Sequence, residues 1–162
     1  MARGRRAPVI TTHKTLGADG SCLSADKSGK SCLQDRNLVL VVDDDLGILR
    51  GVRRLLRQHA YEPILFSSAE AFKNHTDFKK VVCVIFDINL PDGSGIELRH
   101  GLKAAGIRVP VIYMTGNEDP AIRKAALDSG CIAFLTKPFS VLDLIEPLKS
   151  VGGHPNGGDT HE

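Results

Sequence analysis

The sequence predicts an α/β fold in which five parallel strands alternate with five helices, written (βα)5. Short apolar strings rich in β-branched residues alternate with stretches of helical apolar spacing, and the connections between them are short. The chain has no Trp and only 5% aromatic residues, so its core must be mainly aliphatic. Strands that are apolar throughout are typical of a parallel sheet with helices on both faces. We therefore expect a doubly wound sheet.

Composition divides the 162 residues into three segments. Residues 1–37 are rich in Gly, Ser, Lys and Arg, lack apolar periodicity, and carry seven Lys or Arg against three Asp. We expect a flexible basic tail there, which is most simply solvated but could contact nucleic acid or an acidic partner. Residues 38–150 form the expected domain, and 151–162 are a polar, flexible end.

Five apolar strings are the expected strands. They are Leu38–Val42, Pro63–Phe66, Val81–Phe86, Val109–Met114 and Ile132–Leu135. None approaches the length needed to cross a membrane, so no membrane span is expected.

The first helix is predicted to follow Asp45, which can cap it. Its apolar residues recur at helical spacing: Ile48, Val52, Leu55 and Leu56. Its arginines fall mostly off this stripe: Arg50, Arg53, Arg54 and Arg57. They indicate a solvated face, although such a cluster could also contact a partner.

Capping residues mark the other helices. Ser67 and Glu70 have the spacing of a capping box, which predicts the start of the second helix. The turn-forming segment 91–95 precedes a third helix that ends at Gly106. Asp119-Pro120 starts the fourth helix, with proline at its first position.

The last helix has a good start and an interior defect. Ser140 and Asp143 have capping-box spacing. Pro147 lies inside the helical pattern, and proline there removes a hydrogen bond and clashes with the preceding turn. We expect a kink or an early end.

Polar residues follow the apolar strands at the positions where the strands end. They are Asp43, Asp44, Asp87, Thr115 and Lys137. In doubly wound sheets the ligand site lies at the carboxyl ends of the strands, where the strand order reverses. The sequence therefore predicts that these side chains converge on one site.

The carboxylates of Asp43, Asp44 and Asp87 would repel one another without a cation. Oxygen ligands without His or Cys favour Mg²⁺, with Mn²⁺ possible, over Zn²⁺. The alternative, an ordinary acidic helix start, explains Asp45 well and Asp44 poorly.

The remaining groups suit phosphoryl chemistry. Asp87 directly follows six apolar residues and could act as a nucleophile toward a phosphoryl donor. The Thr115 hydroxyl and the Lys137 ammonium could each bind a phosphate oxygen. A cis peptide bond before Pro138 would fix the turn that directs Lys137.

These motifs identify a resemblance to the receiver domain of bacterial two-component response regulators. The matching strings are VVDDD (41–45), FDINLPDGSGIEL (86–98), VIYMTG (111–116) and GCIAFLTKPF (130–139). The strings LFSSAEAF (65–72) and MTGNEDPAIRKAALDSG (114–130) resemble the FixJ-like branch. The resemblance covers about 38–150 and implies the flavodoxin-like, CheY-like strand order 2-1-3-4-5.

The resemblance also implies roles for the site residues. Asp87 would be the phosphoacceptor. Mg²⁺ would be held by Asp43, Asp44, Asp87 and the backbone carbonyl of Asn89.

Other roles are implied by the resemblance alone. Thr115 and Lys137 would bind the phosphoryl group, and Phe134 would act with Thr115 as the switch. Asn89 and Asn117 occupy positions that modulate acyl-phosphate hydrolysis in the family. From the residues alone, Phe134 would simply be a core aromatic.

The function implied is that of a cytoplasmic bacterial signalling protein, not a classical enzyme. Its phosphoryl donor would be a sensor histidine kinase, a phosphotransfer protein or a small acyl phosphate. The face formed by 119–150 would contact an unknown downstream protein, and phosphorylation could produce a homodimer through it. FixJ-like regulators usually carry a DNA-binding domain after the receiver. Only a short polar segment follows here, so we expect a stand-alone receiver without direct DNA binding.

Three alternatives remain open. A haloacid-dehalogenase-type phosphohydrolase would need an acid two residues after the nucleophile, where this chain has Asn89. A receiver-shaped binding module would have the same fold without being phosphorylated. A DNA-binding protein could use the basic tail, which a salt-dependent binding assay with the tail deleted would reveal.

Overall fold

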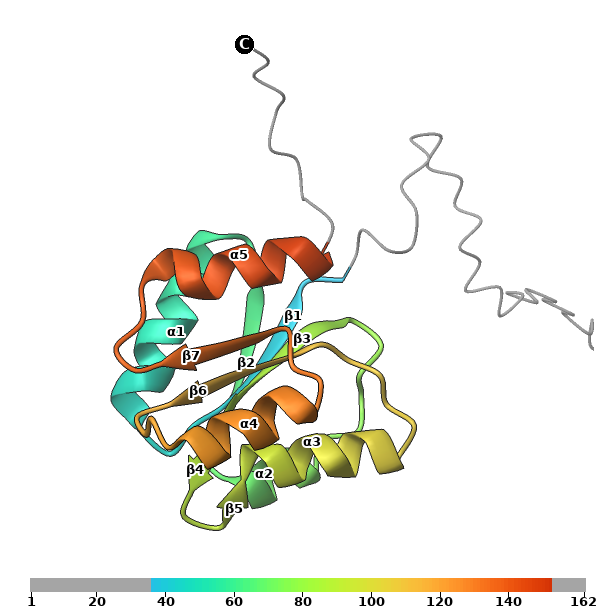
Figure 1. The fold of residues 1–162 in the computed structure, drawn as a ribbon. Helices are drawn as coiled ribbons and strands as arrows, with labels where there is room; N and C mark the ends of the chain where they lie inside the picture. Colours follow the sequence, from blue (N-terminus) through green and yellow to red (C-terminus); the bar gives the residue numbers. More distant parts are fainter. Residues whose placement is uncertain (1–35, 153–162) are drawn as a thin grey trace, which may run out of the picture. The chain divides into compact units, whose positions relative to one another are not determined.

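Five parallel strands form the central sheet (Figure 1), as the computed structural model shows for the described residues 36–152. The strands are β1 (Leu38–Val42), β2 (Glu62–Phe66), β3 (Val81–Asp87), β6 (Val111–Thr115) and β7 (Ala133–Thr136). Their order is β2-β1-β3-β6-β7, and every neighbouring pair is parallel. Numbered within this sheet, the order is 2-1-3-4-5, which confirms the expected topology. The expectations for 1–35 and 153–162 lie outside the described residues.

Helices cover both faces of the sheet (Figure 1). One face carries α1 (Leu46–Gln58) and α5 (Val141–Gly152), and the other carries α2 (Ala69–Lys73), α3 (Gly95–Ala104) and α4 (Pro120–Asp128). A hydrophobic core lies on each face of the sheet. Residues of β3 contribute alternately to the two cores, because successive side chains of a strand point to opposite faces. Cys83 and Ile85 pack with the first helix pair, and Val84 and Phe86 with the other three helices. The predicted doubly wound architecture is confirmed.

Helix α1 begins as predicted but buries a slightly different stripe. The Asp45 carboxylate accepts hydrogen bonds from two backbone N–H groups of the first turn, at 2.7 and 3.2 Å. The fully buried residues are Leu49, Val52 and Leu56. Leu49 was missed, and Ile48 and Leu55 lie half-buried at one edge of the stripe. The reason is that a core-facing stripe is broad enough to include both i+3 and i+4 neighbours.

Helix α2 is capped differently from the prediction. Ser68, not Ser67, accepts the N–H of Ala71 at 3.1 Å. The distant Asp92 also accepts two N–H groups of the first turn, from Ala69 at 3.0 Å and Glu70 at 2.9 Å. The capping-box prediction was therefore wrong by one residue, and the second cap comes from a tertiary contact.

Asp92 reaches α2 because the predicted turn is the tip of a small hairpin. Strand β4 (Asn89–Leu90) pairs antiparallel with β5 (Gly93–Ser94). Two-residue strands are too short to show a period-2 pattern, so the sequence predicted only the turn.

Replacing Asp92 with Asn is expected to destabilise the protein at pH 7 and to have less effect in acid. The two N–H donors of α2 lower the pKa of the Asp92 carboxyl. Because the pKa of this carboxyl is lower in the folded state, its ionised form stabilises the fold at any pH above the unfolded-state pKa of about 3.9. This stabilisation is lost as the pH falls through the folded-state pKa. Urea unfolding of both proteins at a series of pH values would check this. A difference that stays constant between neutral and strongly acidic pH would contradict it.

The remaining helix ends follow the sequence closely. Asp119 caps α4 by accepting the N–H of Ala121 at 2.8 Å, with proline at the first helical position. Gly106 and Gly130 have φ values of 75° and 83°, so they end α3 and α4 in the left-handed conformation that glycine adopts readily.

Helix α5 has its predicted start but not its predicted end. Ser140 and Asp143 exchange hydrogen bonds at 2.9 and 3.2 Å, which confirms the capping box. The helix continues through Pro147 to Gly152, two residues past 150. Of the two expected effects of Pro147, the early end was therefore wrong, and the kink stays a prediction. No helix in residues 36–152 is long and apolar enough to span a bilayer.

Candidate functional site

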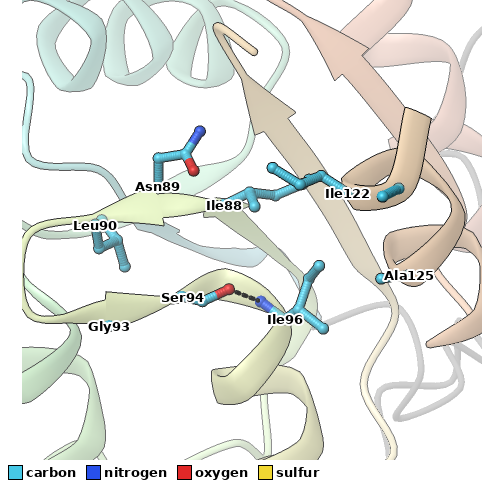
Figure 2. Close-up of a pocket in the computed structure, with 9 residues that line it drawn as sticks. Ile88, Asn89, Leu90, Gly93, Ser94, Ile96, Ile122 and Ala125 are labelled. Atoms are coloured by element: carbon cyan, nitrogen blue, oxygen red, sulfur yellow. Dashed lines mark hydrogen bonds between the residues drawn. The ribbon is translucent and has the colours of Figure 1, made fainter. Parts of the chain in front are cut away.

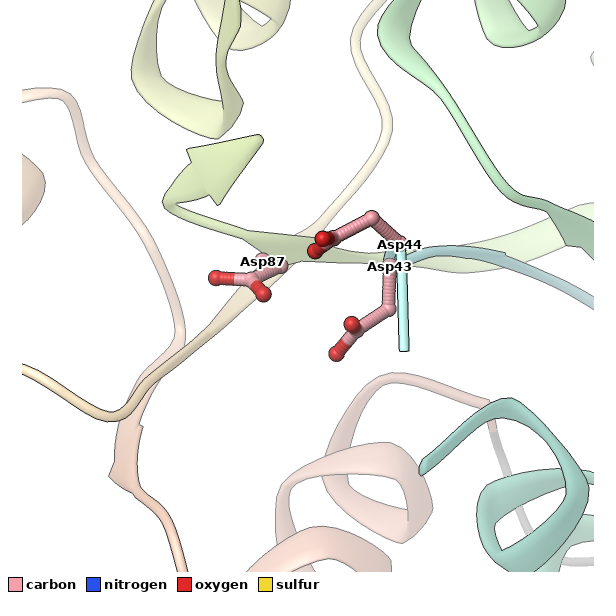
Figure 3. A group of neighbouring side chains, drawn as sticks. All are labelled: Asp43, Asp44 and Asp87. Carbon is pink, nitrogen blue, oxygen red and sulfur yellow. The ribbon is translucent and has the colours of Figure 1, made fainter. Parts of the chain in front are cut away.

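Three carboxylates meet at the carboxyl ends of β1 and β3 (Figure 3). One carboxylate oxygen from each of Asp43, Asp44 and Asp87 lies within 4.8 Å of the other two. Asp43 is fully buried, Asp87 is 5% exposed, and Asp44 is exposed. The cluster is therefore anchored in the protein interior and opens to solvent on the side of Asp44.

The sheet register explains why these residues meet. Val42 at the end of β1 lies opposite Phe86 in β3, so the next residue of each strand carries its carboxylate to the same edge. Strands β1 and β3 are neighbours at the point where the order of connections reverses, which is where ligand sites form in such sheets. The structure thus brings together the three acidic residues that the sequence predicted.

Lys137 directly follows β7, two strands beyond β3, and joins this cluster. Its Nζ lies 2.6 Å from Asp43 Oδ2 and 3.0 Å from Asp87 Oδ2. Its backbone N–H donates to the carbonyl of Thr115 at 2.7 Å, and the bond from Lys137 to Pro138 is cis, as the sequence suggested. The predicted convergence of Lys137 on the site is observed, and the structure adds its pairing with two carboxylates at once.

Burial and charge act in opposite directions on these groups. Burial opposes the charged form of Lys137, but its hydrogen bonds to Asp43 and Asp87 outweigh this and raise its pKa. Burial raises the pKa of Asp43, although Lys137 and the N–H of Asp45 act in the other direction. A raised carboxyl pKa means that the fold disfavours the ionised form.

The donor set fits a hard divalent cation. When all three carboxyls are ionised, they leave two negative charges uncompensated by Lys137. A cation would relieve the cost of ionising Asp43, and its ligands would all be oxygens, as Mg²⁺ and Mn²⁺ prefer. The exposed Asp44 gives such an ion a path from solvent. The residues present therefore fit the metal class that the sequence predicted.

Thr115 ends β6 in a fully buried position beside the acidic residues. Its Oγ1 accepts hydrogen bonds from Asn89 Nδ2 at 3.2 Å and from the N–H of Asn117 at 3.0 Å. The N–H of Asn89 donates to Asp87 Oδ1 at 2.9 Å. Asn89 therefore connects the predicted phosphoacceptor to the predicted hydroxyl group, a link that the sequence did not indicate. The role of its carbonyl as a metal ligand stays a prediction.

Phe134 lies outside the acidic cluster. It is in β7 opposite Tyr113, two residues before Thr136, which is the residue opposite Thr115. Its half-buried ring packs against the core on the α4 side, and the Arg123 guanidinium carbon lies 5.1 Å from the ring centroid. Its packing agrees with the simple interpretation as a core aromatic, and its role in switching stays a prediction.

An apolar cleft of about 440 Å³ adjoins the site (Figure 2). It lies between the β4–β5 hairpin and α4. Its walls include Ile88, Leu90, Ile96 and Ile122, and Asn89 forms part of its rim. Helix α4 is accordingly thinly packed, since Ala126 is its only buried residue.

Comparison with known proteins gives a consistent result. Residues 39–149 match the family model described as the response regulator receiver domain. The response regulator protein TmoT of Ectopseudomonas mendocina is 32% identical over 123 residues, which are 75% of this chain and 56% of that protein. The transcriptional regulatory protein FixJ of Rhizobium meliloti is 28% identical over 116 residues, 72% of this chain and 57% of FixJ.

A solved structure of a receiver domain is also similar to this chain. The CheY-like receiver domain from Methanospirillum hungatei is 31% identical, with a TM-score of 0.62 over 70% of this chain and 91% of that chain. The chain spans a little over half the length of the two curated relatives. The family match begins at the second residue of β1 and ends within α5, so it includes nearly all of the sheet and of the five helices. The chain therefore belongs to the response regulator receiver family, with FixJ among its relatives.

Proposed function

We propose that this receiver domain takes part in two-component signalling by accepting a phosphoryl group on Asp87. The observation that supports this most is the surroundings of the Asp87 carboxylate, which is almost completely buried. It forms an ion pair with Lys137 and lies beside the carboxylates of Asp43 and Asp44. Asp87 is positioned by the Asn89 N–H on Oδ1 and by Lys137 on Oδ2. A carboxylate held in this way presents a nucleophile whose orientation is set before the donor arrives.

The transfer changes the charges around Lys137. An oxygen of Asp87 attacks phosphorus, the bond to the donor's leaving group breaks, and Asp87 becomes an acyl phosphate. Its carboxylate charge is then replaced by a phosphoryl group of higher negative charge. Lys137 can pair with a phosphoryl oxygen in place of the carboxylate, and the Thr115 hydroxyl can donate to another.

A bound Mg²⁺ would neutralise charge on the transferring group. Asp43, Asp44, Asp87 and the Asn89 carbonyl are the groups that we propose would hold it. The phosphohydrolase alternative is disfavoured by Asn89, because its amide cannot serve as a general acid and donates instead to Thr115.

The proposed donor is a sensor histidine kinase or a phosphotransfer protein in the cytoplasm. The proposed output is a protein contact through the face formed by 119–150, with Thr115 and Phe134 as the switch residues. Movement of Thr115 toward a phosphoryl group would act on the thinly packed α4, which adjoins the cleft.

The stand-alone action of the domain and the absence of direct DNA binding stay predictions. An unchanged sedimentation coefficient on phosphorylation would exclude the expected homodimer.

The experiment is an intact-mass measurement after incubation with acetyl phosphate and Mg²⁺. We expect the wild type to gain the mass of one phosphoryl group, and Asp87→Asn to gain none, because an amide is not a nucleophile here. EDTA should prevent the gain. No adduct with acetyl phosphate or with a panel of histidine kinases would favour the alternative of a receiver-shaped binding module.

A further inference from the structure

Helix α1 carries four arginines and no acidic residue. Arg50, Arg53, Arg54 and Arg57 are all exposed, and their spacing places them on one face of the helix. With Gln58 they line an open groove of about 510 Å³. We call these four side chains the arginine face.

The arginine face points away from the acidic site. Arg57 pairs with Glu62 of β2 at 3.6 Å, so the face lies toward β2, the edge strand of the sheet. The opposite flank of α1 contributes Ile48, Gly51 and Leu55 to a separate pocket that includes Lys137. A partner on the arginine face would therefore not cover the phosphorylation site.

The positive charge of this face is largely uncompensated. Within residues 36–152, Glu62 is the only carboxylate within ion-pairing distance of the four arginines, and it reaches only Arg57. Residues 38–152, from β1 to α5, contain fourteen Lys or Arg and fourteen Asp or Glu, so this domain is neutral as a whole. The arginine face is thus a local concentration of charge rather than part of a generally basic domain.

The chemistry of the face indicates the kind of partner. Guanidinium groups match carboxylates in bidentate pairs, and Glu62 already supplies one carboxylate to Arg57. From Arg50 to Arg57 the face spans about 10 Å of helix, which matches acidic residues spaced over two turns of a partner helix. It has no aromatic residue on which nucleotide bases could stack. The exposed Leu46 one turn earlier is too little apolar surface to enter a bilayer. A neutral domain also lacks the broad positive field typical of nucleic-acid binding.

We propose that the arginine face binds an acidic helical segment of a protein partner. This surface does not depend on phosphorylation of Asp87. It gives the protein a second contact, distinct from both the acidic site and the face formed by 119–150.

The test uses the full chain and a labelled, alanine-based helical peptide with Glu at i, i+3, i+4 and i+7. The same peptide with Gln at those positions is the probe control. Fluorescence anisotropy is measured for wild type and for R50Q/R53Q/R54Q, which keeps the Arg57–Glu62 pair. The matched control K79Q/K80Q/R108Q removes the same charge from exposed positions elsewhere.

We expect the Glu peptide to bind wild type and the control variant alike, and to lose about tenfold in affinity with R50Q/R53Q/R54Q, as for three exposed ion pairs. Binding should weaken with added salt. Absence of binding at low salt, or equal loss in both variants, would overturn the proposal. So would tighter binding of duplex DNA or anionic vesicles through the same three arginines, because the partner would then not be an acidic protein.

Phosphorylation separates this proposal from the preceding one. R50Q/R53Q/R54Q should accept a phosphoryl group from acetyl phosphate as the wild type does. Asp87→Asn should bind the Glu peptide normally. Loss of peptide binding in Asp87→Asn would contradict the independence of the two surfaces.

Discussion

Replacing Lys137 with methionine is expected to weaken the metal-free fold and to strengthen Mg²⁺ binding at the same time. Lys137 pairs with Asp43 and Asp87, which are almost completely buried. Its removal leaves these carboxylates facing each other without a counter-charge, and breaking a buried ion pair costs on the order of 3 kcal/mol of unfolding free energy. The same loss removes a positive charge that repels an incoming cation, so Mg²⁺ should bind at least about tenfold more tightly.

Two measurements check this. Urea unfolding in EDTA gives the stability of the metal-free protein, and calorimetric titration gives the Mg²⁺ affinity. Lys124→Met is the control, because Lys124 pairs with Asp128 in an exposed i,i+4 bridge. That change should have little effect on the free energy of unfolding, because exposed ion pairs contribute little, and it should leave Mg²⁺ affinity unchanged. Unchanged or weaker Mg²⁺ binding by Lys137→Met would show that the ammonium and the metal do not share the acidic site.

Replacing Gly95 with alanine is expected to destabilise the protein by about 3 kcal/mol. Gly95 begins α3, where the helix meets the end of β3. A Cβ there would lie 2.5 Å from the carbonyl oxygen of Asp87 and 2.8 Å from the Cβ of Phe86. Neither atom belongs to a flexible side-chain end, so the backbone must shift, and overpacking of this kind usually costs 1–3 kcal/mol or somewhat more. The shift should also displace Asp87 and slow its phosphorylation.

Gly101→Ala is the matched control within the same helix. A Cβ at Gly101 meets nothing within 4 Å. Alanine is favoured over glycine in a helix interior, so this variant should be up to about 1 kcal/mol more stable than wild type. Chemical denaturation of both variants gives the comparison. Equal stability of Gly95→Ala and wild type would mean that α3 can move away from β3 at no cost.

The sheet could be predicted from the sequence because each of its strands contains a continuous apolar run. Leu38–Val42 matched β1 at both ends, and the other strands were placed within about two residues. The helix starts at Asp45 and Asp119 were also predicted, because their caps are local in sequence. Features that depend on distant residues were not predictable, and Asp92 capping α2 from another loop is the clearest of these.

The acidic site likewise has features that could be predicted from the sequence and contacts that could not. The convergence of Asp43, Asp87 and Lys137 followed from one rule about the carboxyl ends of parallel strands. The rule does not specify contacts, so the double pairing of Lys137 and the bond from Asn89 to Thr115 required coordinates. The position of Gly95 against Asp87 has no local sequence signal, because Gly95 sits in a turn-rich string where glycine is ordinary.

The most direct test of the central claim is to locate the phosphoryl group. The protein is phosphorylated with acetyl phosphate and Mg²⁺, reduced with borohydride to convert an acyl phosphate into a stable alcohol, digested and sequenced by mass spectrometry. We predict homoserine at position 87, with Asp43 and Asp44 unmodified, because only Asp87 is positioned by both Asn89 and Lys137. Modification at Asp43 or Asp44, or phosphate on a hydroxyl or histidine side chain with residue 87 unchanged, would contradict the proposed role of Asp87.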